Sequence, residues 1–128
     1  MQNSLEQIED GLITLNVNSC VLTIEGQHEI QLTFSQMMLF RALMQGMTQK
    51  KDIIAFIWGT TSEKEYENNY HQLIFQTRKL LRVNELPVKL LTTIPRHGLR
   101  LNESVLKAIR ITHKNKLRRL LNRIIDLS

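Results

Sequence analysis

Apolar and polar residues alternate in the first third of the chain with a period of two, which is typical of short, half-buried strands. The alternation is clearest over residues 13–18, and the segments 21–24 and 29–32 have a similar β-branched character. Residues 25–27 contain a glycine and provide a turn between the last two segments. We therefore expect a small antiparallel sheet of three or four strands.

The period then changes to that of amphipathic helices. Thr33 is a candidate helix N-cap, and Gln36 three residues later completes a capping-box pattern. This first helix is expected to stop at Gly46. Thr48 is a candidate cap for a second helix, which is expected to end at Gly59.

A third helix has the clearest amphipathic pattern. It is expected to begin between Ser62, which forms a further capping-box pattern with Glu65, and Asn68, and to run to about Arg82. Its apolar side repeats at i, i+3, i+4 and i+7 and consists of Tyr70, Leu73, Ile74, Thr77, Leu80 and Leu81.

A β-hairpin and a last helix complete the expected elements. The hairpin consists of a strand over 88–94, a turn, and a returning strand over 99–101. The last helix covers 103–127, in one piece or in two pieces around Thr112. The expected fold class is therefore α+β, with an N-terminal antiparallel sheet, a three-helix core, a C-terminal hairpin and an added C-terminal amphipathic helix.

Four segments stand in an order and spacing that resemble a known domain. They are Leu32-Thr33 with Leu39-Phe40 and Leu43, then Ile53-Ile54 with Ile57-Trp58-Gly59, then Asn68 to Leu81, and Thr93 to Leu101. Together these segments, within roughly residues 12–102, resemble the OmpR/ToxR/CadC-type effector domain of bacterial transcription regulators. Thr77, Leu99 and Gln36 depart from that pattern, which usually has leucine, tyrosine and glutamate there.

The resemblance implies a winged helix-turn-helix over residues 1–102, with 103–128 as a basic amphipathic extension. In such a domain the third helix enters the DNA major groove, and the hairpin, or wing, contacts the adjacent backbone or minor groove.

Charge is distributed unevenly along the chain, which has a net charge of +5. Residues 1–77 contain four Lys/Arg and nine Asp/Glu, whereas residues 78–128 contain thirteen and three, so the two parts carry −5 and +10. This asymmetry indicates a polyanionic partner, either nucleic acid or an anionic membrane surface.

The polar side of the third helix supplies most candidate DNA-binding residues: Asn68, Gln72, Phe75, Gln76, Lys79 and Arg82, with His71 at its border. Asparagine and glutamine pair bidentately with adenine, and phenylalanine can contact a thymine methyl group. Lys79 and Arg82 are expected on phosphates. By resemblance, Arg78 joins the residues that contact the DNA backbone. The competing interpretation is a solvated helix face.

The hairpin adds Arg96, His97 and Arg100 as candidates for backbone or minor-groove contact. Lys50 and Lys51 open the second helix, where the dipole favours anions, and are expected to help hold a phosphate. The competing interpretation of the hairpin is an ordinary basic turn.

The C-terminal helix has an apolar side formed by Leu117, Leu120, Leu121, Ile124 and Leu127, while lysines and arginines occupy the remainder. Three interpretations stay open. The apolar side packs on its own domain or on a second subunit in a homodimer, it binds a protein partner of the transcription machinery, or it lies on an anionic membrane surface.

The sequence contains few of the patterns that enzymes use. Four histidines lack close metal-ligand spacing, Cys20 is the one cysteine, and neither a glycine-rich phosphate loop nor a Gly-x-Ser-x-Gly motif is present. The longest apolar run has six residues, against about 20 for a membrane span. We expect a cytoplasmic protein without enzyme activity, cofactor, metal or membrane span.

The expected function is that of a transcription regulator that binds double-stranded DNA sequence-specifically. The alternative is a winged-helix protein-interaction module or anti-regulator that docks a partner protein rather than DNA.

Overall fold

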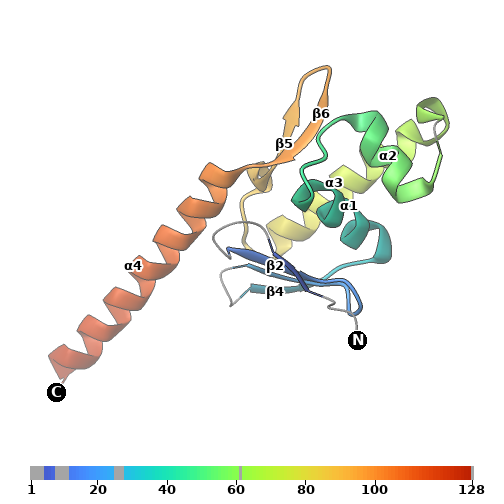
Figure 1. The fold of residues 1–128 in the computed structure, drawn as a ribbon. Coiled ribbons are helices and arrows are strands. Elements are labelled where there is room, and N and C mark those ends of the chain that lie inside the picture. The colour runs from blue at the N-terminus through green and yellow to red at the C-terminus, as the bar shows by residue number, and fades with distance from the viewer. Residues whose placement is uncertain (1–4, 8–11, 25–27, 61, 128) are drawn as a thin grey trace.

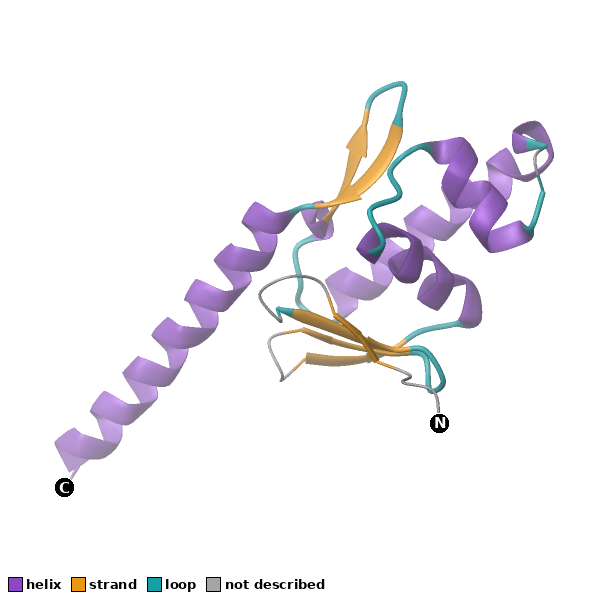
Figure 2. Ribbon diagram, viewed as in Figure 1, coloured by secondary structure: helices purple, strands orange, loops and turns teal. Residues whose placement is uncertain are grey.

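The computed structural model describes residues 5–7, 12–24, 28–60 and 62–127, and the side chains of 12–24, 28–60 and 62–125. These residues form an α+β fold, as expected (Figure 1). Helices α1, α2 and α3 lie between a four-stranded sheet at one end and a two-stranded hairpin at the other, and helix α4 leaves the body (Figure 2).

The sheet is an antiparallel meander in the order β1(Leu5–Gln7), β2(Ile13–Asn16), β3(Val21–Ile24) and β4(His28–Gln31). Strands β2, β3 and β4 confirm the sequence prediction to within two residues at each end, and β1 is a fourth strand. The turn predicted at 25–27 lies outside the described residues. Alternate residues of the sheet face the core, and the fully buried ones are Ile13, Leu15, Leu22 and Ile24.

Helix α1(Phe34–Met44) begins with the predicted capping box. The backbone N–H of Gln36 donates to Thr33 Oγ1 at 3.2 Å, and the N–H of Thr33 donates to Gln36 Oε1 at 2.9 Å. Both bonds satisfy amide groups that the first turn of a helix would leave without partners. The helix ends at Gln45, and Gly46 follows with φ +90°.

Helix α2(Lys50–Trp58) ends as predicted at Gly59, which has the left-handed φ of +66°. The predicted cap at Thr48 is wrong, because Gln49 occupies the N-cap position and makes no side-chain cap bond. The Thr48 side chain instead contacts His97 of the hairpin.

Helix α3(Glu67–Val83) follows a short 3-10 helix, η2(Glu63–Tyr66). The capping box predicted at Ser62 is wrong, because the Ser62 side chain makes no cap bond. The junction is held instead by Tyr66, whose ring stacks on Trp58 of α2 at a centroid distance of 5.4 Å.

The hairpin consists of β5(Leu91–Ile94) and β6(Gly98–Leu101). The returning strand, predicted over 99–101, is confirmed to within one residue, and the first strand is shorter than predicted. Residues 88–90, predicted as strand, form the 3-10 turn η3(Val88–Leu90) instead. Pro87 precedes this turn, and the backbone N–H of Leu90 donates a hydrogen bond to the carbonyl oxygen of Pro87. The buried side chains of Leu90, Leu91 and Leu99 anchor the hairpin in the core.

Helix α4(Glu103–Leu127) is one continuous helix, so the two-piece alternative around Thr112 is not observed. Its first turns belong to the body, since Leu106 and Ile109 are buried in the same core as the sheet and α1. The residues from 110 to 125 are exposed apart from the half-buried His113, so packing of the apolar side on its own domain does not occur there. The side chain of Leu127 lies outside the described side chains.

None of the described helices, α4 included, has the length and apolar character that crossing a bilayer would require.

Candidate nucleic-acid interface

Helix α3 has one buried side and one exposed side, as its apolar period predicts. Tyr70, Leu73, Ile74, Thr77 and Leu81 are buried. The seven residues expected on the polar side are all exposed: Asn68, His71, Gln72, Phe75, Gln76, Lys79 and Arg82. The helix therefore offers a polar surface that its own domain leaves uncovered.

Thr77 is a polar residue on the buried side of α3. Its hydroxyl donates a 2.6 Å hydrogen bond to the carbonyl oxygen of Leu73, one turn earlier. Because the hydroxyl has a partner, its burial carries little of the penalty that an unsatisfied polar group would incur. Thr77 can consequently lie within the core beside Leu73 and Ile74.

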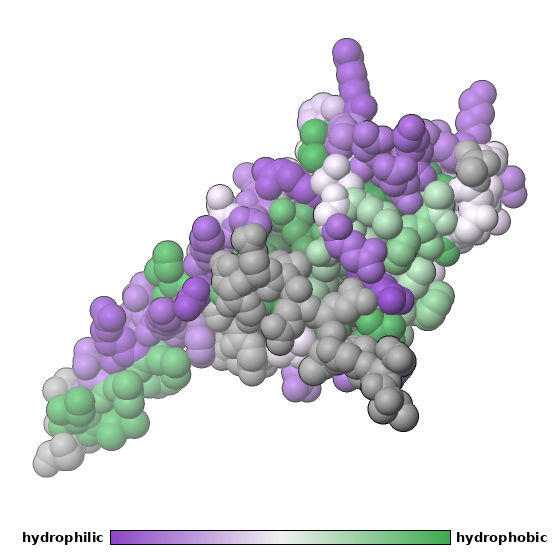
Figure 3. Space-filling model, in the orientation of Figure 1, coloured by the Kyte–Doolittle hydropathy of each residue, from purple (hydrophilic) through white to green (hydrophobic). Residues whose placement is uncertain are grey.

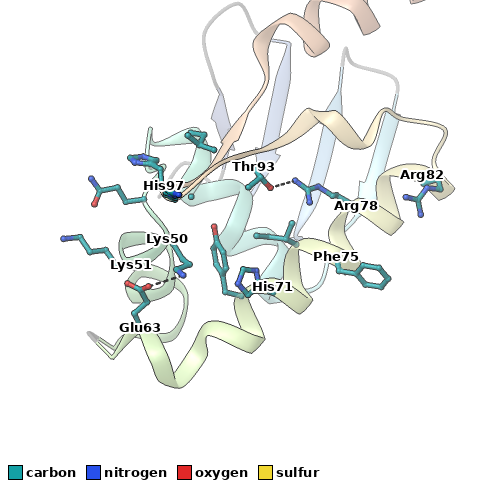
Figure 4. A pocket seen from close by; sticks show the side chains of 15 residues that line it. Lys50, Lys51, Glu63, His71, Phe75, Arg78, Arg82, Thr93 and His97 are labelled. Carbon is teal, nitrogen blue, oxygen red and sulfur yellow. Dashed lines mark hydrogen bonds and ion pairs between the residues drawn. The ribbon is translucent and has the colours of Figure 1, made fainter.

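Phe75 is a large apolar side chain in the middle of the exposed side of α3, and Val83 is another at the end of the helix. The ring is 69% exposed. It projects outward from the helix, between His71 and Arg82 along the chain (Figure 4). An aromatic ring amid amides and cations provides an apolar contact point in an otherwise polar surface.

The hairpin is joined to α2 by main-chain hydrogen bonds. The N–H of Leu99 donates to the Thr48 carbonyl, and the N–H of Lys50 donates to the His97 carbonyl, both at 2.9 Å. Gly98 lies between these bonds, and a Cβ atom there would come within 1.9 Å of the Thr48 oxygen. Glycine is therefore required at this position for the hairpin to approach α2 so closely.

The three candidates on the hairpin, Arg96, His97 and Arg100, are all exposed. Arg96 stands in its turn with φ +62°, a conformation that costs a non-glycine residue about 1 kcal/mol. Arg100 projects from β6. His97 Nε2 lies 2.8 Å from Thr48 Oγ1, so the imidazole is tied to the segment before α2.

A cleft of about 680 Å³ opens between α3, the start of α2 and the hairpin (Figure 4). Glu63 is the one carboxylate among its described lining residues. Five cationic side chains also line it: Lys50, Lys51, Arg78, Arg82 and Arg96. A concave surface with this excess of positive charge attracts anions.

The cleft brings together six of the eleven residues predicted from the sequence: His71, Phe75, Arg78, Arg82, Arg96 and His97. The other five lie on the exposed surface outside it: Asn68, Gln72, Gln76, Lys79 and Arg100. Sequence reasoning missed Gln49, Tyr70 and Thr93, which also line the cleft. Gln49 carried no signal as a site residue. Tyr70 was expected on the apolar side of the third helix and Thr93 in the hairpin, and only the packing of α2, α3 and the hairpin brings them to one cleft.

Arg78 fastens α3 to the hairpin. Its Nη2 donates to the Leu91 carbonyl at 2.6 Å and to Thr93 Oγ1 at 2.9 Å, and its Nε donates to the Leu91 carbonyl at 3.1 Å (Figure 4). The resemblance places Arg78 on the DNA backbone, but three of its donor contacts are made within the protein. Its observed role is to fix the hairpin relative to α3.

Lys50 is held by two carboxylates. Its Nζ lies 2.8 Å from Glu67 and 3.2 Å from Glu63. The hydrogen bond with Glu67 raises the pKa of Lys50, and the same contact lowers the pKa of Glu67. This paired charge is poorly suited to the phosphate contact expected from the sequence, whereas the neighbouring Lys51 is exposed.

Among the described residues, no group of three or more histidine, cysteine or acidic side chains lies close enough to hold a metal ion.

No protein-family model matches this chain. No match to a curated protein is found either.

Proposed function

We propose that this chain is a winged helix-turn-helix domain that binds double-stranded DNA sequence-specifically, as a bacterial transcription regulator in the cytoplasm. Helix α3 would be the recognition helix, and the hairpin β5–β6 would be the wing. The proposal rests on one observation above all. The uncovered polar side of α3 and the exposed hairpin border the same cationic cleft.

The dimensions and side chains of α3 suit the major groove. The helix has 17 residues and is therefore about 25 Å long, and the groove is about 12 Å wide. Asn68, Gln72 and Gln76 present amides that pair with adenine edges, and Phe75 presents an apolar ring to a thymine methyl group. These four residues would read the sequence.

Cationic residues around the same surface would hold the DNA backbone. Lys79 and Arg82 lie on the exposed side of α3, and Arg96 and Arg100 lie on the hairpin. His97 would contact the backbone or minor groove beside them. Phosphate contacts of this kind position the protein without reading bases. Arg78 would act indirectly, through the hairpin that it fastens.

Selection of bound sites from a pool of random DNA duplexes tests the proposal directly. We expect enrichment of a short motif, with an affinity for the selected duplex that falls steeply as salt increases. The Gln76→Ala variant should change discrimination at one base position by about 1–3 kcal/mol, measured by fluorescence anisotropy. The Gln45→Ala variant is a matched control, because Gln45 is an exposed glutamine at the end of α1.

Absence of binding to the random pool at low salt would refute DNA recognition. Recovery of a protein partner by the same chain would then favour the protein-interaction alternative. Binding without any enriched motif would retain the DNA contact but refute base readout by α3.

A further inference from the structure

The outer part of α4 leaves the body of the protein. Leu106 and Ile109 are the last residues of the helix in the hydrophobic core. Beyond them the helix extends away from the sheet and the hairpin (Figure 1). The segment from residue 110 to 125, whose side chains the structure describes, has no core residue, and an unpacked helix of about this size is only marginally stable in water. A surface that covers it would therefore stabilise it.

This outer part carries an exposed apolar stripe, which we call the tail stripe. It consists of five side chains that are 46% to 66% exposed: Leu117, Leu120, Leu121, Ile124 and Ile125. Apolar side chains gather at the far end of α4 in Figure 3. A contiguous apolar patch of this kind marks an interaction site more often than a solvated surface.

The tail stripe is too broad and too short for a coiled coil. At 100° per residue, its five members span an arc of about 140°. The alternating spacing of three and four residues that a coiled-coil seam uses is followed by Leu117, Leu120 and Ile124, and equally by Leu117, Leu121 and Ile124. They cover about one heptad, whereas a coiled coil is indicated by three to four heptads or more. A wide apolar face fits a flat surface better than a second helix.

The charge on α4 also disfavours a second copy. Seven cationic residues occur between positions 107 and 123, with no acidic residue among them: Lys107, Arg110, Lys114, Lys116, Arg118, Arg119 and Arg123. Two such helices side by side would repel each other. The partner should therefore be anionic.

The cations border the tail stripe on both edges. By helical angle, Lys116 and Arg123 lie beyond Leu120 on one edge, and Arg118 lies beyond Ile125 on the other. DNA would satisfy these charges but has no apolar surface for the stripe. A bilayer with anionic headgroups offers negative charge above an apolar layer, which matches both features.

We propose that the outer part of α4 binds in the plane of an anionic lipid surface, with the tail stripe in the acyl boundary and the flanking cations on the headgroups. This attachment is peripheral and independent of the proposed DNA binding, since its residues lie outside the cleft.

Sedimentation of the full chain with lipid vesicles tests the proposal. One set contains neutral phosphatidylcholine alone, and the other contains equal parts of phosphatidylcholine and anionic phosphatidylglycerol. We expect binding to the anionic vesicles only. The triple variant L120Q/L121Q/I124Q should bind at least about a hundredfold more weakly, since each partly buried aliphatic side chain contributes up to tenfold.

Glutamine is chosen because its helix propensity is close to that of leucine, and all three positions are exposed, so the variant should fold. The matched control is Ile111→Gln. Ile111 is an exposed isoleucine of the same helix outside the tail stripe. It should leave vesicle binding unchanged.

Two results would overturn the proposal. Unchanged binding of the triple variant to anionic vesicles would show attraction by charge alone. The second result is that the chain does not bind vesicles but associates with itself or with an acidic protein, and that the triple variant abolishes this association. It would assign the tail stripe to a protein contact. DNA binding by the triple variant reports separately on the proposed function.

Discussion

Replacement of Gly98 by alanine should detach the hairpin from α2. The added Cβ atom would lie 1.9 Å from the Thr48 carbonyl oxygen and 2.8 Å from the Lys50 amide nitrogen. Both neighbours are main-chain atoms, so rotation of a side chain cannot relieve the overlap. The two backbones must separate by about 1 Å or more to reach an ordinary contact distance.

The magnitude follows from the bonds on either side of Gly98. Separation would break the two 2.9 Å hydrogen bonds, Leu99 N–H to Thr48 and Lys50 N–H to His97. Each contributes about 1 kcal/mol, and forced overpacking adds about 1–3 kcal/mol. We therefore expect the free energy of unfolding to fall by about 3–5 kcal/mol, a large share of the roughly 5–15 kcal/mol typical of a domain.

Urea denaturation measures the loss, and hydrogen exchange of the Leu99 and Lys50 amides shows whether it is local. Both amides should exchange faster in Gly98→Ala than the global loss alone explains. Gly46→Ala is the control. Gly46 has a φ of +90°, and no atom of the described residues beyond its chain neighbours lies within 4 Å of the position of an added Cβ atom, so this variant introduces backbone strain without steric overlap. Equal unfolding free energies for the natural chain and Gly98→Ala would refute the close approach.

Three further predictions concern the interface. Arg78→Lys should weaken both stability and DNA affinity, because an ammonium group cannot keep the fork of bonds to Leu91 and Thr93; unchanged affinity would contradict the fastening role. Arg96→Gly should raise the free energy of unfolding by up to about 1 kcal/mol, because glycine adopts the φ of +62° without strain. The same variant should lower DNA affinity, because it removes a cation from the hairpin. Thermal unfolding measures the first effect, and a DNA titration measures the second. Lys79→Ala should lower the salt slope of DNA binding by about 0.9. Lys89→Ala should leave the slope unchanged, because Lys89 is an exposed lysine of η3 and belongs neither to α3 nor to the hairpin strands.

The elements that could be predicted from the sequence are those whose determinants lie close together along the chain. The capping box of Thr33 and Gln36 spans three residues, and the stop at Gly59 depends on its own φ. The two sides of α3 follow from helical geometry alone. Local chemistry therefore sufficed for the strands, the helix α1 and the exposure of the candidate DNA-reading residues.

The contacts that the sequence did not predict involve partners that are distant along the chain. Thr48 has the right chemistry for a helix cap, but its hydroxyl contacts His97, 49 residues away. Lys50 has the right charge for a phosphate, but Glu67, 17 residues later, takes it. Arg78 similarly bonds to a carbonyl 13 residues away. No periodicity records such contacts, because they arise only when α2, α3 and the hairpin pack together.

The structure also separates the cationic residues of the C-terminal part into two groups, which the charge count along the sequence did not distinguish. Residues 78–128 contain thirteen lysines and arginines, of which seven belong to α4 and six to the segment from α3 through the hairpin. The first group adjoins an exposed apolar stripe, and three members of the second group, Arg78, Arg82 and Arg96, line a polar cleft. Since DNA offers charge and polar base edges but no extended apolar surface, one polyanion does not match both groups. Loss of vesicle binding in the tail-stripe variant with DNA binding retained, and weaker DNA binding in Lys79→Ala with vesicle binding retained, would demonstrate two separate anionic partners. A decrease of both activities in both variants would refute this division.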